Sequence, residues 1–320
     1  MKRSLVFSAF VCFFTVLPLS AQGDFQKGIS YYKQGQYQKA IGEFEQIVKE
    51  NPDYEAGYRV LGDSYLKVKN FQKAAQAFDR ALELKPNNFV SYYGAAVAEF
   101  NLTQYRKCAA TLLRGEKHAK TPREQYQVYQ LRGSAYYSME RFDQAVVDLE
   151  KAISIQRGGA KESLQLGIAH YQLGNMAEAR RYLELAASLN PNSAEAKRFL
   201  SRTQYAEAVT AIQEAKYQRA ITALQEFIGE NPDDGEAWYN LGLALLFSED
   251  LEAAERSLKR SAELSPDSWE TFDRLGYLYE RKKRFQDSIG SYRKAFQLHQ
   301  DPRITESIER VEERIRRTKS

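Results

Sequence analysis

The chain has 320 residues, of which 43% are hydrophobic and 28% charged, a balance that excludes both an intrinsically disordered chain and an integral membrane protein. Only 18 Gly and 8 Pro accompany 21 Tyr and 17 Phe, so the composition favours long helices rich in aromatic residues. Two Cys exclude a disulfide framework, and three His disfavour a histidine-rich metal site.

The first 21 residues have the layout of a secretory signal peptide. Lys2 and Arg3 precede an uncharged apolar run over 4–19, and Ala21 offers a small residue for cleavage. The competing interpretation is a retained membrane anchor, because the run is only slightly shorter than a membrane span. We favour cleavage, which predicts a protein exported to the periplasm, the cell surface or the extracellular space, with no membrane span after cleavage.

The charge balance gives no reason to expect nucleic acid as a partner. The net charge is +4, and removal of the first 21 residues, which carry two basic and no acidic residues, leaves +2. A chain this close to neutral has no strong electrostatic attraction for phosphate backbones or anionic membranes. Cys108 would then be the only cysteine, and we expect it to be a small core residue.

An internal repeat dominates the rest of the chain. The segment 37–41 (YQKAI) recurs as 217–221 (YQRAI), and 50–53 (ENPD) recurs as 230–233, in both cases 180 residues later. A shorter period lies beneath it: the Leu-Gly pairs at 61–62, 166–167, 241–242 and 275–276 each precede a small Ala or Ser by 12 residues. This spacing resembles that of the tetratricopeptide repeat, a helix–turn–helix unit of about 34 residues.

The best copy is 55–88, where every signature position is filled, and the copy at 89–125 is degenerate and carries three extra residues. Tyr58, Leu61 and Tyr65 fall on one face of a helix, which predicts an amphipathic first helix. The residues expected to pack the helices of each unit are Gly62, Tyr65, Ala74, Phe78, Pro86, Gly167, Ala179, Trp238, Gly242, Ala254 and Gly276.

The resemblance implies an all-α fold, an α-solenoid that forms a right-handed superhelix of about eight units with a C-terminal cap helix. After the signal peptide (1–21), we expect units one to five over 22–193, units six to eight over 194–302 and the cap helix over 303–320. One such hairpin cannot bury its apolar face alone, so neighbouring units must stack.

Two irregularities interrupt the regular spacing of the repeat. Residues 194–200 are seven extra residues, and because 194–215 contains no Gly or Pro, it is predicted to form one long first helix. This segment is either a seam between two sub-arrays or a longer helix inside one array. The other irregularity is Thr121-Pro122-Arg123, predicted to be a loop between helices.

The segment 303–317 predicts the cap helix. Ile304, Ile308, Val311 and Ile315 make a single apolar stripe at helical spacing. Pairs four residues apart are expected to form ion pairs on its exposed face: Glu306–Arg310, Glu312–Arg316 and Glu313–Arg317.

No known catalytic or metal-binding motif appears. A nucleotide-binding loop and the spacings typical of zinc or redox sites are absent, and the repeats leave no segment large enough for a catalytic domain. The carboxylates are expected on exposed helix faces beside basic residues, and His170 is expected to pack at a helix interface. We therefore expect no enzyme, no cofactor and no metal.

In the family that the chain resembles, first helices line a concave groove that binds ligands. Carried onto this sequence, the ligand-facing positions are mainly aromatic or aliphatic, so the carboxylate clamp of some family members is not expected. We expect an apolar groove for an amphipathic helix or an extended peptide, with Tyr93, Tyr239 and Phe247 as the leading contacts. The aromatic candidates are Phe25, Tyr32, Tyr93, Phe100, Tyr137, Tyr171, Tyr205, Tyr239, Phe247 and Tyr277; the alternative is that these rings pack between neighbouring first helices.

These features favour a non-catalytic scaffold or adaptor that binds a protein or peptide partner during assembly of a cell-envelope complex. The alternative is a carbohydrate-associated repeat protein that supports polysaccharide export, since aromatic faces also stack on sugars. A regulatory or catalytic subunit is disfavoured because the repeats leave no segment large enough for a further domain. Neither the identity of the partner nor the oligomeric state follows from the sequence.

Overall fold

A computed structural model describes residues 19–156 and 158–319, and every element in this part of the chain is helical. The predicted signal peptide lies almost wholly outside the described residues. No helix in the described part is long and apolar enough to cross a bilayer. The all-α helical-repeat class expected from the sequence is confirmed.

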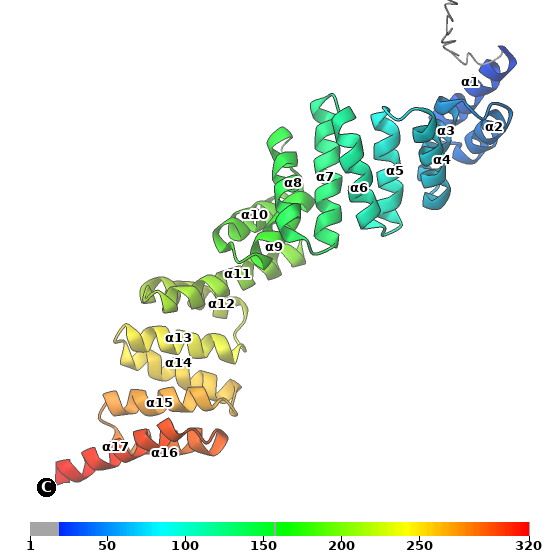
Figure 1. Cartoon of the computed structure of the whole chain (residues 1–320). Helices are drawn as coiled ribbons and strands as arrows, with labels where there is room; N and C mark the ends of the chain where they lie inside the picture. Colours follow the sequence, from blue (N-terminus) through cyan, green and yellow to red (C-terminus); the bar gives the residue numbers. More distant parts are fainter. Residues whose placement is uncertain (1–18, 157, 320) are drawn as a thin grey trace, which may run out of the picture. The chain divides into compact units, whose positions relative to one another are not determined.

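The helices follow one another as antiparallel hairpins (Figure 1). In chain order the pairs are α1 (Leu19–Lys33) with α2 (Tyr37–Glu50), α3 (Glu55–Lys67) with α4 (Phe71–Leu84), α5 (Phe89–Asn101) with α6 (Tyr105–Gly115), α7 (Pro122–Ser138) with α8 (Phe142–Ile155), α9 (Ala160–Gln172) with α10 (Met176–Leu189), α11 (Ala194–Gln213) with α12 (Tyr217–Glu230), α13 (Gly235–Phe247) with α14 (Leu251–Leu264) and α15 (Trp269–Arg281) with α16 (Phe285–Leu298), after which comes the single helix α17 (Pro302–Lys319).

One predicted boundary between helices is wrong. Pro122 and Arg123 are not loop residues, because α7 begins at Pro122. The Thr121 side chain accepts from the Glu124 backbone N–H while the Glu124 carboxylate accepts from the Thr121 N–H, which is a capping box. A short 3₁₀ turn, η1 (Glu116–His118), takes the last positions of the second helix in the degenerate unit. The three extra residues, 123–125, lie in α7, which has 17 residues where α3 has 13.

The seven extra residues at 194–200 belong to α11, which is one continuous helix of 20 residues as predicted. The chain forms two compact units, one ending at Ala169 and the other beginning at His170. The possible seam at 194–200 stays a prediction.

Close contact between the two helices of a hairpin depends on a residue without a side chain in the first helix. A Cβ at Gly62 would lie 2.9 Å from the Phe78 ring, and a Cβ at Gly276 would lie 2.6 Å from the Tyr292 ring. Gly242 stands against Leu258 in the same way. Gly28 has the same contact with Phe44 at 2.6 Å, so the first hairpin, α1–α2, shares this feature.

The remaining packing residues surround these contacts. Ala74, Phe78, Ala179 and Ala254 are fully buried, and Tyr65 is nearly so. Pro86 is exposed just beyond the end of α4, where a proline cannot continue the helix. Trp238 is half-buried, and its indole N–H donates to the Pro232 carbonyl at 2.9 Å. Gly167 is buried in α9.

All eight hairpin turns use one backbone conformation. One residue in each turn has a positive φ: Gly35, Lys69, Thr103, Glu140, Gly174, Ala215, Glu249 and Lys283. The next residue donates its N–H to a carbonyl five residues back, as Asn70 does to Tyr65 at 2.9 Å and Gln104 to Glu99 at 2.9 Å. This bond is typical of a Schellman motif, which satisfies the last carbonyls of a helix. Only two of the eight positions carry the glycine that this conformation favours.

The cap helix packs as predicted, but its ion pairs differ. Ile304 and Val311 are buried against α16 in a cluster that includes Tyr292, and Ile308 and Ile315 lie at its edge. Of the three predicted pairs only Glu313–Arg317 forms. Arg310 pairs instead with Glu280 of α15 at 3.2 Å, and Glu312 pairs with Arg293 of α16 at 3.1 Å.

Replacing Thr103 by glycine should stabilise the chain. Thr103 is a β-branched residue at φ 58°, a conformation that disfavours L side chains by about 1–2 kcal/mol, partly offset by the extra entropy of glycine in the unfolded chain. We expect Thr103→Gly to raise the free energy of unfolding by about 0.5–1 kcal/mol in urea titrations followed by helical circular dichroism. Gly35→Ala is the matched control at φ 75° and should lose about 1 kcal/mol; a stabilising Gly35→Ala would contradict this view of the turns.

Ala74→Arg tests the helix register. Ala74 is fully buried in the hydrophobic cluster that includes Phe44 and Phe78. A guanidinium at this position lacks both space and a partner, so the substitution should lower the free energy of unfolding by at least about 3 kcal/mol. Gln76→Arg, on the exposed face of the same helix, should stay within about 0.5 kcal/mol of the parent. Thermal melting curves of the two variants compare them directly, and an unchanged curve for Ala74→Arg would show that the register is wrong.

Candidate functional site

The ten aromatic candidates from the first helices all remain partly exposed. Nine are half-buried, and Phe247 is 45% exposed. None is a fully buried core residue, although each also packs against a neighbour.

One group packs within its own hairpin. Tyr32, Phe100 and Tyr137 each meet the aromatic residue that begins the second helix, edge to face, with ring centroids 5.4, 5.1 and 5.9 Å apart. The partners are Tyr37, Tyr105 and Phe142. This geometry stabilises an aromatic pair beyond area burial, and all three first-helix rings stay half-buried.

The other rings contact a buried core residue or a ring of a neighbouring hairpin. Phe25 meets Phe44 and Tyr54, Tyr93 stacks on Phe89, Tyr171 meets Phe199, Tyr205 meets Phe227, and Phe247 stacks on Tyr217. Tyr239 and Tyr277 lie against the core of the second unit. The sequence left two alternatives for these rings, contact with a ligand or packing between helices. The structure fits both, because each ring packs on a neighbour and stays partly exposed. Their role in binding stays a prediction.

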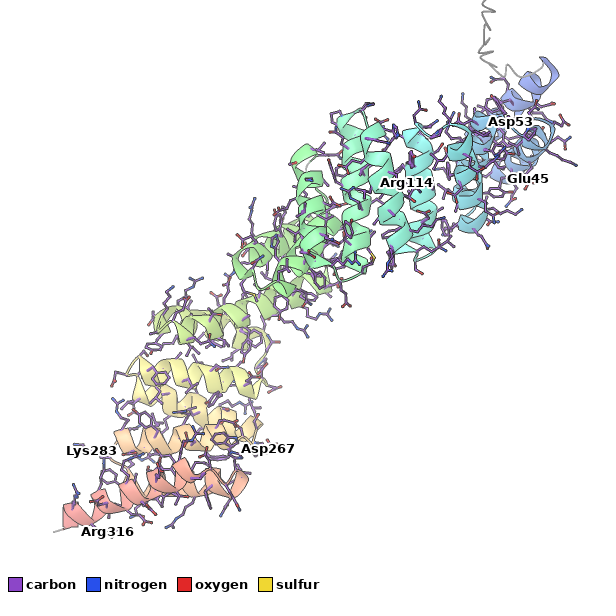
Figure 2. The ribbon with its side chains drawn as sticks, in the orientation of Figure 1. Glu45, Asp53, Arg114, Asp267, Lys283 and Arg316 are labelled. Carbon is purple, nitrogen blue, oxygen red and sulfur yellow. The ribbon has the colours of Figure 1, made fainter. Side chains whose placement is uncertain are left out.

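Two hollows of the second compact unit, which begins at His170, lie near the loops that join successive hairpins. One, of about 470 Å³, is lined by Tyr239, Asn240 and three carboxylates, Glu236, Asp267 and Glu270, with no lysine or arginine. Figure 2 shows Asp267 and Lys283 at opposite ends of α15, so this hollow lies away from the hairpin turn that holds Lys283. The aromatic ring that the sequence favoured most in this unit, Tyr239, thus borders an acidic surface.

The second hollow has the opposite charge. It measures about 440 Å³ and is lined by Tyr171, Arg198, Arg202 and Tyr205 among others, with Asp234 as its one acidic residue. A hydrogen bond of 2.7 Å from the Asn240 amide to the Tyr205 hydroxyl joins the two hollows. Sequence patterns did not reveal Arg198 and Arg202, because they lie outside the groove positions of the repeat.

The first compact unit, which ends at Ala169, has a hollow of about 330 Å³ lined by residues of α6, α7 and α8. Leu113 and Val147, which are 63% and 53% exposed, border it. Arg132 and Asp148 line the same hollow. The Arg132 guanidinium donates to both carboxylate oxygens of Asp148, at 2.6 and 2.9 Å, and to the carboxylate of Glu116 at 2.6 Å. Burial alone would lower the pKa of Arg132, but these bonds outweigh it and raise the pKa, so the guanidinium stays charged.

Several carboxylates are buried, contrary to the expectation that they lie on exposed faces. Glu99, Asp148, Glu255 and Glu280 are each at most 7% exposed. Each has a basic partner, as Glu99 has Lys107 at 3.1 Å. The sequence did not show this, because most of the partners come from other helices; Lys259, four residues after Glu255 on α14, is the exception.

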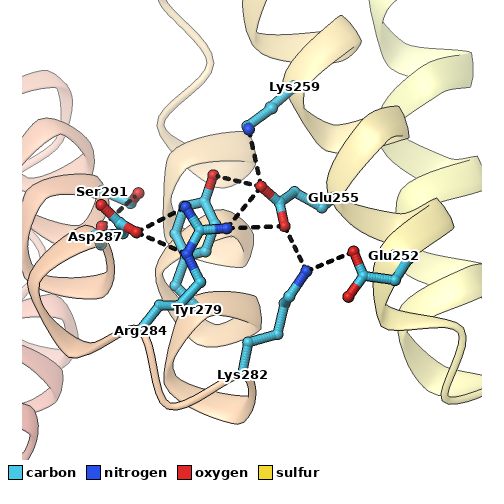
Figure 3. A network of polar contacts seen from close by, with 8 residues as sticks. All are labelled: Glu252, Glu255, Lys259, Tyr279, Lys282, Arg284, Asp287 and Ser291. Carbon is cyan, nitrogen blue, oxygen red and sulfur yellow. Dashed lines mark hydrogen bonds and ion pairs between the residues drawn. The ribbon is translucent and has the colours of Figure 1, made fainter.

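The largest of these networks surrounds Glu255 (Figure 3). Its carboxylate accepts from Lys282 at 2.6 Å and from Arg284 at 3.0 and 3.1 Å, and it pairs with Lys259 at 2.8 Å. The Tyr279 hydroxyl donates to it at 3.4 Å. Burial alone would raise the pKa of Glu255, but the bonds from the three cations outweigh it and lower the pKa to about 2. A carboxylate held ionised in this way joins α14 to α15 and is poorly suited to act as a general acid or base.

Glu255→Gln should destabilise the second unit in a pH-dependent way. The folded pKa of about 2 lies below the unfolded value of about 4.3, so the stabilisation is complete above pH 5 and is lost as the pH falls toward 2. We expect the variant to lose about 3 kcal/mol at pH 7 and to approach the parent near pH 2.

Urea titration followed by tryptophan fluorescence measures this effect, since both Trp residues, Trp238 and Trp269, lie in the second unit. Glu252→Gln is the control, because its side chain is 73% exposed and a surface pair contributes at most about 1 kcal/mol. A deficit in Glu255→Gln that did not change with pH would contradict the assignment.

The other reactive side chains are also sequestered. Burial raises the pKa of the Cys108 thiol to about 12, which fits a core residue and disfavours a nucleophile. His170 is 5% exposed and stacks on Tyr182 with ring centroids 5.5 Å apart, so its predicted place at a helix interface is confirmed. Within the described residues no group of three or more His, Cys, Asp or Glu side chains is placed to hold a metal ion.

Family models described as tetratricopeptide repeat match residues 25–89, 136–203 and 205–268, which together exceed half of the chain. The chain belongs to the tetratricopeptide repeat family. Two of the matched segments begin at residues 25 and 205, which reproduces the 180-residue recurrence seen in the sequence. Members of this family are generally modules for protein–protein interaction.

Solved tetratricopeptide repeat structures resemble the chain at low identity. MamA from Desulfovibrio magneticus RS-1 is 20% identical with a TM-score of 0.41, over 55% of this chain and 96% of that one. YrrB, described as a TPR protein with an unusual peptide-binding site, is 20% identical with a TM-score of 0.41, over 66% and 99%. The TPR domain of P58(IPK) is 12% identical with a TM-score of 0.36, over 93% and 99%. These scores carry no conclusion about function. A comparison with curated proteins gave no match.

Proposed function

We propose that this tetratricopeptide repeat protein is a non-catalytic scaffold that binds a peptide or helix of a partner protein along its first helices. The observation that carries the proposal is that all ten first-helix aromatic rings stay accessible: nine are half-buried and Phe247 is 45% exposed. Rings held on one side and open on the other offer large contact areas that lose little entropy on binding. The paired state of the buried carboxylates and the high thiol pKa support a binding role over catalysis.

The proposal includes export and a role in assembly of a cell-envelope complex. Its support is the basic start, apolar run and small residue before position 22. The intact mass of the protein purified from an envelope fraction tests this part: a mature chain that begins at Gln22 agrees with it, and an uncleaved chain in the cytosol contradicts it. No finding favours the carbohydrate-associated alternative.

Phe247→Ala should weaken partner capture without unfolding the chain. The side chain is 45% exposed and stacks only on one face, against Tyr217 at 5.5 Å, so its loss should lower stability by about 1 kcal/mol or less. We expect at least a fivefold drop in protein recovered from envelope extract, quantified by mass spectrometry.

Leu298→Ala is the matched control, because Leu298 is 37% exposed at the end of a second helix, α16. It should leave capture unchanged. Equal capture by Phe247→Ala and the parent, with helical circular dichroism unchanged in both, would show that the first-helix aromatics are not the binding surface.

A further inference from the structure

The seven-residue insertion in α11 is the sequence irregularity that the proposed function does not use. α11 has 20 residues, whereas α9, α13 and α15 have 13 each. The added residues, 194–200, bring Arg198 to the hollow of about 440 Å³ in the second unit and place Phe199 beneath its guanidinium. Neither residue corresponds to a groove position of the ordinary repeat.

Two arginine side chains border this hollow, and neither forms an ion pair with an acidic residue in the described part of the chain. Arg198 and Arg202 both lie over the Phe199 ring, with their guanidinium carbons 5.2 and 5.7 Å from its centroid. Phe199 is itself 7% exposed and meets the Tyr171 ring at 5.6 Å. The cation–π contacts hold both guanidinium groups over a buried platform and leave their N–H groups exposed, so the pair is ordered before a ligand arrives.

The acid in the hollow is already engaged. The Asp234 carboxylate accepts from the Ala237 backbone N–H at 2.9 Å and caps α13. The hollow also offers a hydroxyl donor, since Ser201 Oγ accepts from the Asn231 amide at 3.2 Å, which leaves the Ser201 proton available. The open side of the hollow is therefore positively charged and rich in donors, with Tyr171 and Tyr205 beside it.

The spacing of the two arginines selects a ligand geometry. Residues four apart on a helix are separated by about 6 Å along its axis. In an extended peptide, side chains two residues apart point the same way and are about 6.6–7 Å apart. Two carboxylates separated by one residue therefore fit two arginines separated by one helical turn, and each arginine can form two parallel hydrogen bonds to its carboxylate.

We propose that the insertion in α11 makes this hollow a docking site for an extended acidic segment of a partner protein. Arg198 and Arg202 each bind one of two carboxylate side chains that are two residues apart, and Tyr171 and Tyr205 contact the apolar residues beside them. This inference rests on the proposed function, because it names the chemistry of the segment that the scaffold binds.

The neighbouring hollow argues for a peptide over a nucleic acid. Glu236, Asp267 and Glu270 line that hollow and would repel a phosphate backbone that continued past Tyr205. The net charge of the chain is only +4, which gives little counterion release on a polyanion. A short acidic segment fits the arginine pair without reaching these carboxylates.

The test uses the full chain and a capped, fluorescein-labelled octapeptide with glutamate at its third and fifth positions and leucine beside them. Fluorescence anisotropy should show binding that weakens at least tenfold when glutamine replaces both glutamates. The double variant Arg198→Glu, Arg202→Glu should also lose at least tenfold, and the double variant Arg198→Gln, Arg202→Gln keeps approximate size without the charge and should lose nearly as much. Both arginines are exposed, so helical circular dichroism should not change.

Arg256→Glu is the matched control, since Arg256 is an exposed arginine on the second helix α14 of the same unit. It should bind the acidic peptide like the parent. Equal affinity for the glutamate and glutamine peptides, or full affinity in either double variant, would overturn the proposal. Tighter binding of a 20-base-pair DNA duplex that the same double variants abolish would also overturn it in favour of a nucleic acid.

Failure of this inference differs from failure of the proposed function. If the acidic peptide does not bind but Phe247→Ala still lowers capture of envelope proteins, the scaffold function stands and the acidic site is wrong. If Phe247→Ala has no effect on capture either, both proposals are wrong.

Discussion

The rest of the structure depends on one steric contact, in which a glycine of the first helix lies directly against a large side chain of the second. Gly62 faces Phe78, Gly242 faces Leu258 and Gly276 faces Tyr292, each pair 16 residues apart, with distances that leave no room for a Cβ. The contact brings the two backbones close together and fixes the rotation of each helix about its axis. Once this rotation is fixed, the small residues of the second helix, such as Ala74 and Ala254, must face inward.

The same constraint determines which side chains reach the surface. With the glycine face turned toward the second helix, the aromatic positions of the first helix lie at the edge of the hairpin, where Tyr32 and Phe100 are half-buried. Each hairpin turn maintains this arrangement through one residue with a positive φ and the same backbone N–H to carbonyl hydrogen bond. This holds even where the residue is Thr103 or Glu249. A rigid repeat with half-exposed rings follows from packing within each hairpin, and a surface of this kind suits recognition of protein segments.

Sequence reasoning predicted the hairpins because the determinants are local and repeat at a fixed spacing. It placed the long helix α11 and the cap helix α17 correctly for the same reason. The prediction of a loop at the start of α7 was wrong, although the sequence does contain a helix-start signal: Thr121 and Glu124 have the spacing of a capping box.

Features that depend on how neighbouring helices stack were not predictable. Two of the cations around Glu255, Lys282 and Arg284, come from the α15–α16 turn, and the partner of Arg310 is Glu280 of α15. The arginine-lined hollow arises because an insertion lengthens α11 beside α9 and α12, so no pattern within one repeat could indicate it. The aromatic positions were predictable, but their half-burial required the structure.

Hydrogen–deuterium exchange of the full chain, alone and with a protein captured from the envelope, tests the central claim that the first helices form the binding surface. Backbone amides in α11, α13 and α15 should gain protection in the complex, while those in α12, α14 and α16 should change little. Protection confined to the second helices, or no change anywhere in the described chain, would contradict the assignment of a scaffold that binds its partner through its first helices.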